Sequence, residues 1–356
     1  MRRLAILAVA GLVACGGPDP DAPTRRVRIS PGTPFAAVAD TLEARGIIDA
    51  PRVFRLFARL TGAEDDIKAG TYEFREGARW RDVLGALTEG RVAHDRVTIP
   101  EGWEIRRIAP TLAGLIGIPE DSVAAFLLDT AAANRFNVPG PTLEGYLYPA
   151  TYGVPAGASL EEVVEPMVRE YRARWPPERE ARADSMGLTE REVATLASIV
   201  EKEARVRDEM PTIAAVYLNR LEIGYPLQAD PTVQYARGEH ATRLLFAHID
   251  EVADNPYNTY TRPGIPPGPI GSPSERAIDA VLHPADVDYL YFVARPDGTH
   301  EFNRHLEDHN RARARIRREL EAGRTDTVPG DAGRPVGTGL GPVKPTATSR
   351  SAAMVP

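Results

Sequence analysis

Cysteine is almost absent from this sequence, which has one in 356 residues, so no disulfide can form within the chain. A glycine-rich phosphate loop and a G-x-S-x-G nucleophile elbow are also missing, and no cofactor is expected.

The histidines predict no metal site. His305 and His309 have helical i, i+4 spacing, but Glu307 lies between them at the wrong position for a zinc protease motif, and no third ligand is evident. His300 and His309 are interpreted as structural hydrogen bonders.

A hydrophobic run long enough to span a bilayer is lacking as well. Arginines at positions 2 and 3 precede a short apolar run over residues 4–13, which is typical of a signal peptide. Residues 12–16 (LVACG) resemble a bacterial lipobox, which predicts a signal peptide of residues 1–14 and lipidation of Cys15. An uncleaved membrane anchor is the alternative. In both cases we expect the rest of the chain in the cell envelope outside the cytoplasm, held to a membrane by a flexible tether of residues 15–23.

Basic residues are outnumbered by acidic ones. Removal of residues 1–14 takes away two arginines and leaves 41 basic against 50 acidic groups, a net charge of −9. Nucleic acid is therefore not expected as a partner, because its binding depends on neutralising phosphates. The remaining 342 residues suffice for two or three domains.

A repeat with an offset of 70 residues lies in the first half of the chain. Val27, Gly32 and Leu42 match Val97, Gly102 and Leu112, and each copy has the pattern of a short strand, a glycine turn and an amphipathic helix. Residues 24–135 are thus predicted to form two related α+β units. The pattern resembles LysM-like modules, which bind glycans; a structural platform for the second half is the alternative.

The longest buried helix is predicted over residues 190–206, where Thr189 and Glu192 form a capping box. Its apolar face consists of Val193, Leu196, Ala197, Val200 and Ala204. Glu201 and Glu203 follow this face about 200° apart around the helix axis, so they cannot act together on one substrate. An ionised carboxylate is costly to bury without a partner, so one of the two is a candidate functional group. The alternative is that both are solvated helix ends paired with Lys202 or Arg205.

Aromatic and proline-rich loops surround this helix in the sequence. Residues 143–152 contain Glu144, Tyr146 and Tyr148, a combination that suits a saccharide cleft, although tyrosines also pack in cores. Residues 225–233 and 255–270 are predicted to be irregular loops, and 323–356 to be disordered. Further helices are predicted at 160–174 (capped by Ser159 and Glu162), 211–223, 275–283 (capped by Ser272) and 311–322.

The motifs of the second half resemble the endolytic murein transglycosylase family (MltG or YceG-like). They are EGYLYP at 144–149, ASIVEKE at 197–203, PLQADPTV at 226–233, YNTY at 257–260, GIPPGPI at 264–270 and YLYFVA at 289–294. The resemblance implies a mixed α+β fold, with a module at 24–96, a LysM-like module at 97–140 and a catalytic domain at 141–322. It also implies Glu201 as the catalytic residue, peptidoglycan synthases as partners and work at the inner membrane. The lipobox, where the family commonly has a transmembrane helix, and Ala229, where serine is frequent, depart from its pattern.

The chemistry implied is cleavage of nascent peptidoglycan glycan strands by one carboxylic acid. Glu201 would protonate the glycosidic oxygen, which requires a pKa above the usual value of about 4.3, and the C6 hydroxyl of the same muramyl residue would then attack C1 to give a 1,6-anhydro end. A lysozyme-type hydrolase with Asp230 as nucleophile and a non-catalytic glycan-binding lipoprotein are the alternatives. Gln228, Asn258 and Tyr260 would hold N-acetyl groups and sugar hydroxyls, or would bond within their own loops.

Overall fold

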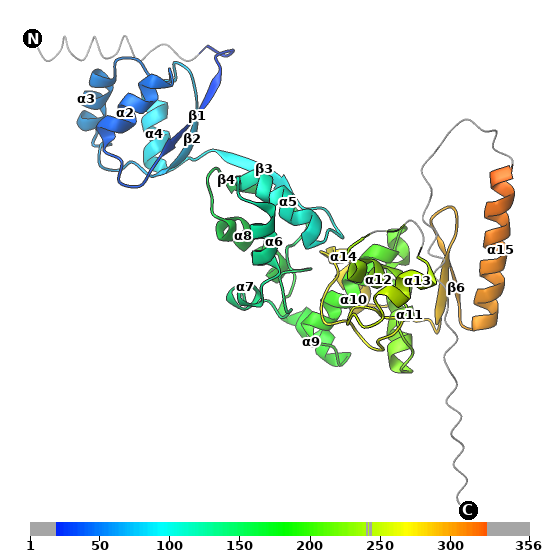
Figure 1. The fold of residues 1–356 in the computed structure, drawn as a ribbon. Helices are drawn as coiled ribbons and strands as arrows, with labels where there is room; N and C mark the ends of the chain where they lie inside the picture. Colours follow the sequence, from blue (N-terminus) through cyan, green and yellow to red (C-terminus); the bar gives the residue numbers. More distant parts are fainter. Residues whose placement is uncertain (1–18, 240, 242–243, 326–356) are drawn as a thin grey trace, which may run out of the picture. The chain divides into compact units, whose positions relative to one another are not determined.

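The computed structural model describes residues 19–239, 241 and 244–325 and has a mixed α+β fold (Figure 1). In chain order the elements are β1 (Thr24–Ile29), α2 (Phe35–Ala44), α3 (Pro51–Thr61), β2 (Gly70–Arg75), α4 (Trp80–Glu89), β3 (His94–Thr98), α5 (Ile105–Ile116), α6 (Glu120–Leu127), α7 (Thr130–Arg135), β4 (Thr151–Pro155), α8 (Leu160–Arg172), α9 (Pro177–Ser185), α10 (Glu190–Glu203), η1 (Arg207–Glu209), α11 (Met210–Glu222), α12 (Asp230–Arg237), α13 (Phe246–Glu251), α14 (Glu275–Leu282), β5 (Tyr291–Ala294), β6 (His300–Asn303) and α15 (Leu306–Thr325). Their strands form three two-stranded sheets, β1–β2, β3–β4 and β5–β6. Among the described helices none could cross a bilayer.

Two compact units divide the chain. Of the described residues, the first contains 19–97 together with 112–118 and 151–163, and the second contains 98–111, 119–150 and those from 164 to 325. In the first unit the antiparallel pair β1–β2 aligns Val27 with Tyr72. Helices α2, α3 and α4 supply the rest of its core, in which the Phe54 ring stacks on Phe35 and meets Trp80 edge-on. A sheet of two strands is marginal by itself, so this helical cover stabilises the unit.

The repeat expected from the sequence appears as two strand–turn–helix segments. The first copy is β1 followed by α2, and the second is β3 followed by α5. Gly32 and Gly102 lie at matching places between strand and helix, with φ of 74° and 71°. Glycine adopts this left-handed conformation without the steric cost that a Cβ brings. The predicted element order is thereby confirmed.

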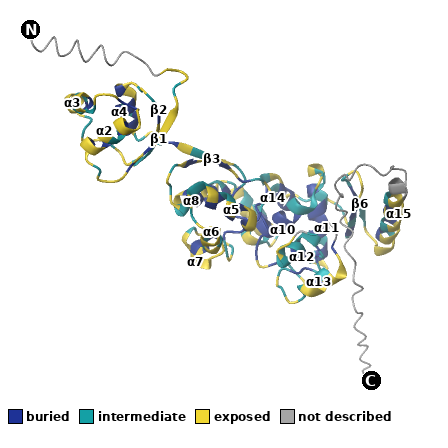
Figure 2. Ribbon diagram, turned by 45° about the horizontal axis from the view of Figure 1, so that its top comes forward, coloured by how far each residue is buried: buried dark blue, intermediate teal, exposed yellow. Residues whose placement is uncertain are grey.

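Helix α10 is the buried axis of the second unit and packs against α11 and α14. Its predicted capping box is confirmed, since the Glu192 side chain accepts from the Thr189 backbone at 2.8 Å while Thr189 Oγ1 accepts from the Glu192 backbone. All residues from 193 to 200 are buried (Figure 2). The helix ends at Glu203, three residues before the predicted end, because Ala204 has an extended backbone with ψ of 113°.

Two sequence predictions near α10 were wrong. The segment predicted as a loop up to residue 233 turns into helix α12 at Asp230, because Pro231 at the first helical turn needs no backbone donor and Asp230 favours a helix start. The cap of α14 is Ser274 and not Ser272. Ser274 Oγ accepts from the backbone N–H of Ala277 at 3.2 Å, whereas Ser272 Oγ is buried without a partner among the described residues.

The last elements form a small subassembly of the second unit. Strands β5 and β6 pair antiparallel, with Tyr291 opposite Asn303. Val293 packs with Ala312 and Ile316 of α15. This helix begins five residues before the predicted start at 311 and ends at Thr325, so it extends into the segment predicted to be disordered. The remainder of that segment, 326–356, and the predicted signal peptide and lipidated Cys15 lie outside the described residues.

Candidate active site

Three consecutive charged residues end helix α10, and each has its own partner. Glu201 accepts hydrogen bonds from Ser274, Lys202 donates to Glu104, and Glu203 accepts from Tyr217. Successive helix positions differ by about 100° around the axis, so the three side chains enter different surroundings. This confirms the expectation that Glu201 and Glu203 do not face a common point.

The carboxyl of Glu201 is held by the start of helix α14. Glu201 Oε2 accepts from the backbone N–H of Ser274 at 3.1 Å and from its hydroxyl at 2.5 Å. Because Ser274 Oγ also accepts from Ala277 as the helix cap, its hydrogen is directed at Glu201. On another side, a Cβ added at Gly102 would lie 3.6 Å from Glu201 Cγ, so the glycine turn approaches this side chain closely. Glu201 Oε1 is the oxygen left to carry a proton.

Burial raises the pKa of the Glu201 carboxyl above its ordinary value. The two hydrogen bonds from Ser274 oppose this rise, and the charge of Glu101 adds to it while that of Arg207 lowers the pKa. Arg207 is itself engaged by Glu101 at 2.6 Å on the surface. The net increase keeps a larger share of Glu201 protonated near neutral pH, which is the requirement for a general acid.

Lys202 and Glu144 form a second group. Lys202 Nζ donates to Glu104 Oε1 at 2.7 Å, where Glu104 is only 3% exposed. Glu144 accepts from the backbone N–H of Ile105 through both oxygens at 3.1 Å, and so holds the first turn of α5. Burial raises the pKa of Glu144 to about 8 despite these bonds. Glu144 was predicted to line a saccharide cleft, but the bonds to Ile105 give it a structural use.

Glu203 belongs to a third group, which also contains Asp230 and Tyr260, two residues predicted from the sequence to bind substrate. Glu203 Oε1 accepts from the Tyr217 hydroxyl at 3.0 Å, and Asp230 Oδ1 accepts from the Tyr260 hydroxyl at 2.5 Å. Burial and the nearby charge of Asp230 raise the pKa of Glu203 to about 8, and burial also raises the pKa of Asp230. The sequence did not indicate that Glu203, which lies closer to the apolar stripe of its helix, would join these two residues.

The other predicted ligand residues are mostly used inside the protein. Tyr146 is fully buried and meets Tyr171 edge-on, and Tyr148 is 9% exposed beneath the Arg174 guanidinium. Asn258 is buried and donates to the carbonyls of residues 249 and 252, which is the loop-internal alternative stated above. Gln228 has a positive φ of 48° beside Asp230 and is half-buried. In this structure Tyr146 and Asn258 therefore cannot reach a sugar.

The histidines contribute to packing in the second unit. His300 Nδ1 lies 2.7 Å from Glu209 Oε2, as expected for a structural hydrogen bonder. His309 differs, because its Nδ1 has no hydrogen-bond partner among the described residues and its ring stacks on Tyr291. Burial lowers the pKa of His309 to about 4. The described ranges contain no cluster of three or more metal-ligating side chains.

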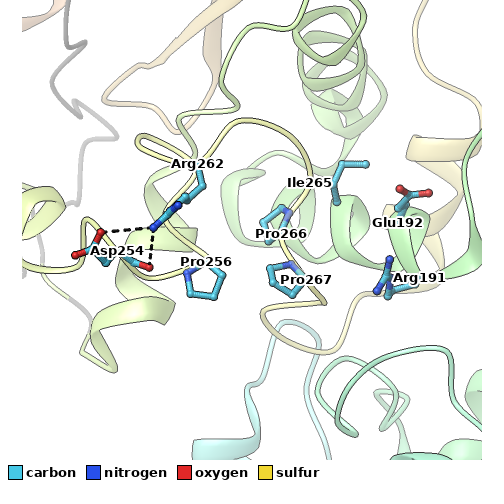
Figure 3. A pocket seen from close by; sticks show the side chains of 8 residues that line it. All are labelled: Arg191, Glu192, Asp254, Pro256, Arg262, Ile265, Pro266 and Pro267. Carbon is cyan, nitrogen blue, oxygen red and sulfur yellow. Dashed lines mark hydrogen bonds and ion pairs between the residues drawn. The ribbon is translucent and has the colours of Figure 1, made fainter.

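A pocket of about 470 Å³ opens at the other end of α10 (Figure 3). Its lining residues are Arg191, Glu192, Asp254, Pro256, Arg262, Ile265, Pro266 and Pro267. It contains neither Glu201 nor any other residue predicted to bind substrate. The motif at 264–270 contributes Ile265, Pro266 and Pro267 to it, but nothing in the sequence indicated that this loop meets the first turn of α10.

The Glu203 carboxyl makes stability depend on pH. Its folded pKa of about 8 exceeds the ordinary 4.5, so the stability that its protonated form contributes is complete below pH 4.5 and is lost as pH rises to about 8. We expect Glu203→Gln to flatten the fall in unfolding free energy over this range, by up to about 1.4 kcal/mol per pH unit. Urea unfolding at several pH values measures it. The exposed Glu222→Gln is the control and should keep the wild-type slope; equal slopes for Glu203→Gln and wild type would refute the expectation.

A partly buried carboxyl of raised pKa, fixed by a helix cap, has the features required of a general acid on a helical scaffold. The chain belongs to the YceG-like family, whose profile matches residues 27–315. It is 31% identical over 307 residues to a protein of Bacillus subtilis strain 168 named endolytic murein transglycosylase, covering 82% of this chain and 84% of that one. A protein of the same name from Streptococcus pneumoniae strain D39 is also 31% identical, and the match covers 80% of this chain but 57% of the pneumococcal one. The crystal structure of a putative yceG-like protein from Listeria monocytogenes is similar, with a TM-score of 0.56 and 30% identity over 82% of this chain and all of that one.

Proposed function

We propose that this protein is an endolytic murein transglycosylase, a lyase that cuts peptidoglycan glycan strands between N-acetylmuramic acid and N-acetylglucosamine and leaves 1,6-anhydro ends. The observation that carries the proposal is the Glu201 carboxyl, which is partly buried, raised in pKa and oriented by Ser274. The family membership and the names of the relatives support the same activity. The product would terminate elongation of a nascent strand.

In the proposed mechanism Glu201 acts first as an acid and then as a base. Its Oε1 proton passes to the glycosidic oxygen as the bond from that oxygen to C1 of the muramyl residue breaks. The C6 hydroxyl of the same residue then attacks C1, and the Glu201 carboxylate accepts the hydroxyl proton. No water is consumed, and no second carboxylate is needed.

The hydrolase alternative finds no support in the position of Asp230. A retaining glycosidase needs two carboxyls about 5–5.5 Å apart across one sugar. Asp230 accepts from Tyr260 and lies by Glu203, which projects away from Glu201. Gln228 remains our proposed sugar-binding residue of this segment, since its half-buried side chain makes no hydrogen bond to another residue in the described part of the chain.

The cellular setting is part of the proposal. Cys15 would be lipidated after removal of residues 1–14, so that the catalytic region at 141–322 acts in the envelope beside a membrane. The modules at 24–96 and 97–140 would contact glycan in the manner of LysM-like modules. Peptidoglycan synthases are the partners that would supply nascent strands.

Mass spectrometry of a peptidoglycan digest tests the proposed reaction. The purified full chain should release muropeptides with 1,6-anhydro ends, which are lighter by one water than the reducing ends of a hydrolase. Reducing ends would identify a muramidase, and binding without release would identify a glycan-binding lipoprotein. Either result would overturn the proposal.

Removal of the Ser274 hydroxyl is expected to move the alkaline limb of the profile of kcat/KM against pH to higher pH. The Ser274 hydrogen bonds favour the ionised carboxylate, so Ser274→Ala raises the pKa of Glu201 further and the acid stays protonated at higher pH. The profile of kcat/KM against pH measures this shift. Ser274→Thr retains both the donor and the helix cap and should keep the wild-type profile. A limb that stays in place, or moves to lower pH, in the alanine variant would show that Ser274 does not tune Glu201.

A further inference from the structure

The pocket at the start of α10 has two charged ends and a rigid apolar floor. Figure 3 shows Arg191 and Glu192 at one end and Arg262 and Asp254 at the other, with three prolines and Ile265 between them. Proline restricts the backbone, so this floor exists before any ligand arrives. Its volume of about 470 Å³ falls within the usual range for sites that bind small molecules.

The two arginines of the pocket are available to a ligand. Arg191 is exposed and makes no ion pair with any residue that the structure describes, while the adjacent Glu192 is fixed by the capping box. Among the residues that the structure describes, Arg262 is paired only with Asp254, at 3.5 Å, and both of these side chains are largely exposed. An exposed pair of this kind contributes little, so a ligand carboxylate can replace it. Guanidinium groups bind carboxylates through two parallel hydrogen bonds.

One chain segment connects this pocket to Glu201. Ile265 and the two following prolines line the pocket beside Arg191, the N–H of Ile270 donates to Ser198 Oγ at 3.0 Å, and Ser274 donates to Glu201. The segment 265–274 therefore follows α10 from its first turn to its last. Arg191 and Glu201 are ten residues apart on that helix, which corresponds to a rise of about 15 Å.

We propose that the pocket binds the free carboxylate end of the peptide stem carried by the muramyl residue that is cleaved. This inference rests on the proposed function. Muramic acid carries its peptide on the lactyl group, and an extended stem of about five residues spans about 17 Å, enough to reach from the bond at Glu201 to Arg191. The carboxylate ends of the stem match the two guanidinium groups, and Glu192 and Asp254 suit an amine along it. A stem joined to its neighbour through its own terminal carboxyl has no such carboxylate, so only stems with a free carboxylate end can occupy the pocket.

Kinetics on two substrates test the inference. The substrates are uncrosslinked glycan strands with intact stems and the same strands after an amidase has removed the stems. We expect the wild type to have a lower KM for the stem-bearing strands, and Arg191→Gln to raise that KM about tenfold while leaving the KM for bare strands unchanged. Arg191→Lys should recover part of the loss. Arg169→Gln, at an exposed position of α8, is the matched control and should behave as wild type on both substrates.

A binding measurement separates failure of this inference from failure of the proposed function. Calorimetric titration with the soluble stem pentapeptide as probe should give equal binding to the wild type and to Glu201→Gln, and binding about tenfold weaker to Arg191→Gln. Equal peptide binding by Arg191→Gln and wild type, or equal use of both strand types by the wild type, would overturn the pocket assignment. An active Glu201→Gln variant would instead overturn the catalytic mechanism, whatever the peptide result.

Discussion

Replacement of Glu201 by glutamine is expected to reduce release of 1,6-anhydro muropeptides by about 10²–10⁴-fold. The amide has the size of the carboxyl and can still accept from Ser274 through its oxygen, but it carries no proton to give to the glycosidic oxygen. The decrease is measured from initial rates of product release from purified peptidoglycan, by liquid chromatography with mass spectrometry. The loss should appear in kcat, because substrate binding does not depend on the acidic proton.

Glu203→Gln is the matched control for this experiment. Both residues end the same helix, and burial raises the pKa of both, yet Glu203 bonds to Tyr217 in a separate group. The control should therefore retain most of the wild-type rate once the variant is shown to be folded by circular dichroism. An inactive Glu203→Gln beside an active Glu201→Gln would transfer the catalytic role to the third group, with Asp230 and Tyr260.

Lys202→Met should cause the largest loss of stability among these variants. Lys202 is the cation that neutralises Glu104, whose side chain is 3% exposed, and its charge also acts on the buried Glu144. Breaking a buried ion pair by removing one partner is strongly destabilising, so we expect a loss of about 3–5 kcal/mol in the free energy of unfolding. Urea unfolding followed by circular dichroism measures it.

Two further variants control for the lost methylene contacts of Lys202. Lys68→Met changes an exposed lysine in the first unit, one that donates to the backbone carbonyl of residue 89, and should cost less than about 1 kcal/mol. The double variant Lys202→Met, Glu104→Gln removes both charges of the pair and should recover part of the loss. If Lys202→Met lowered the free energy of unfolding no more than Lys68→Met does, the ion pair of Lys202 and Glu104 would not contribute to stability.

Local signals in the sequence were enough to predict helix α10 and its two carboxylates. The capping box of Thr189 and Glu192 fixes where the helix starts, and the count of residues from there sets the directions of Glu201 and Glu203. The strand–turn–helix repeat was predictable for the same reason, since Gly32 and Gly102 mark both turns. These features depend on residues only a few positions apart.

Features that depend on distant contacts were not predictable. Ser272 and Ser274 are equally good helix caps by residue type, and the choice of Ser274 follows from its bond to Glu201, 73 residues away. Tyr146 and Asn258 suited a sugar by residue type, but tertiary packing buried both. The pocket lined by Arg191 forms where a distant loop folds back on α10. Hydrophobic periodicity in the sequence does not predict such a contact.

Glu201, Lys202 and Glu203 follow one another at the end of α10 and have three different partners. The number of residues that precede them in this helix is therefore constrained. Losing one codon between the capping box and position 201 would turn everything downstream on the helix by about 100°, presenting a lysine to Ser274 and an acid to Glu104, and gaining one would present Val200 to Ser274. Insertions and deletions in this helix should thus be far less tolerated than substitutions. Mutagenesis libraries for this helix should therefore contain substitutions only.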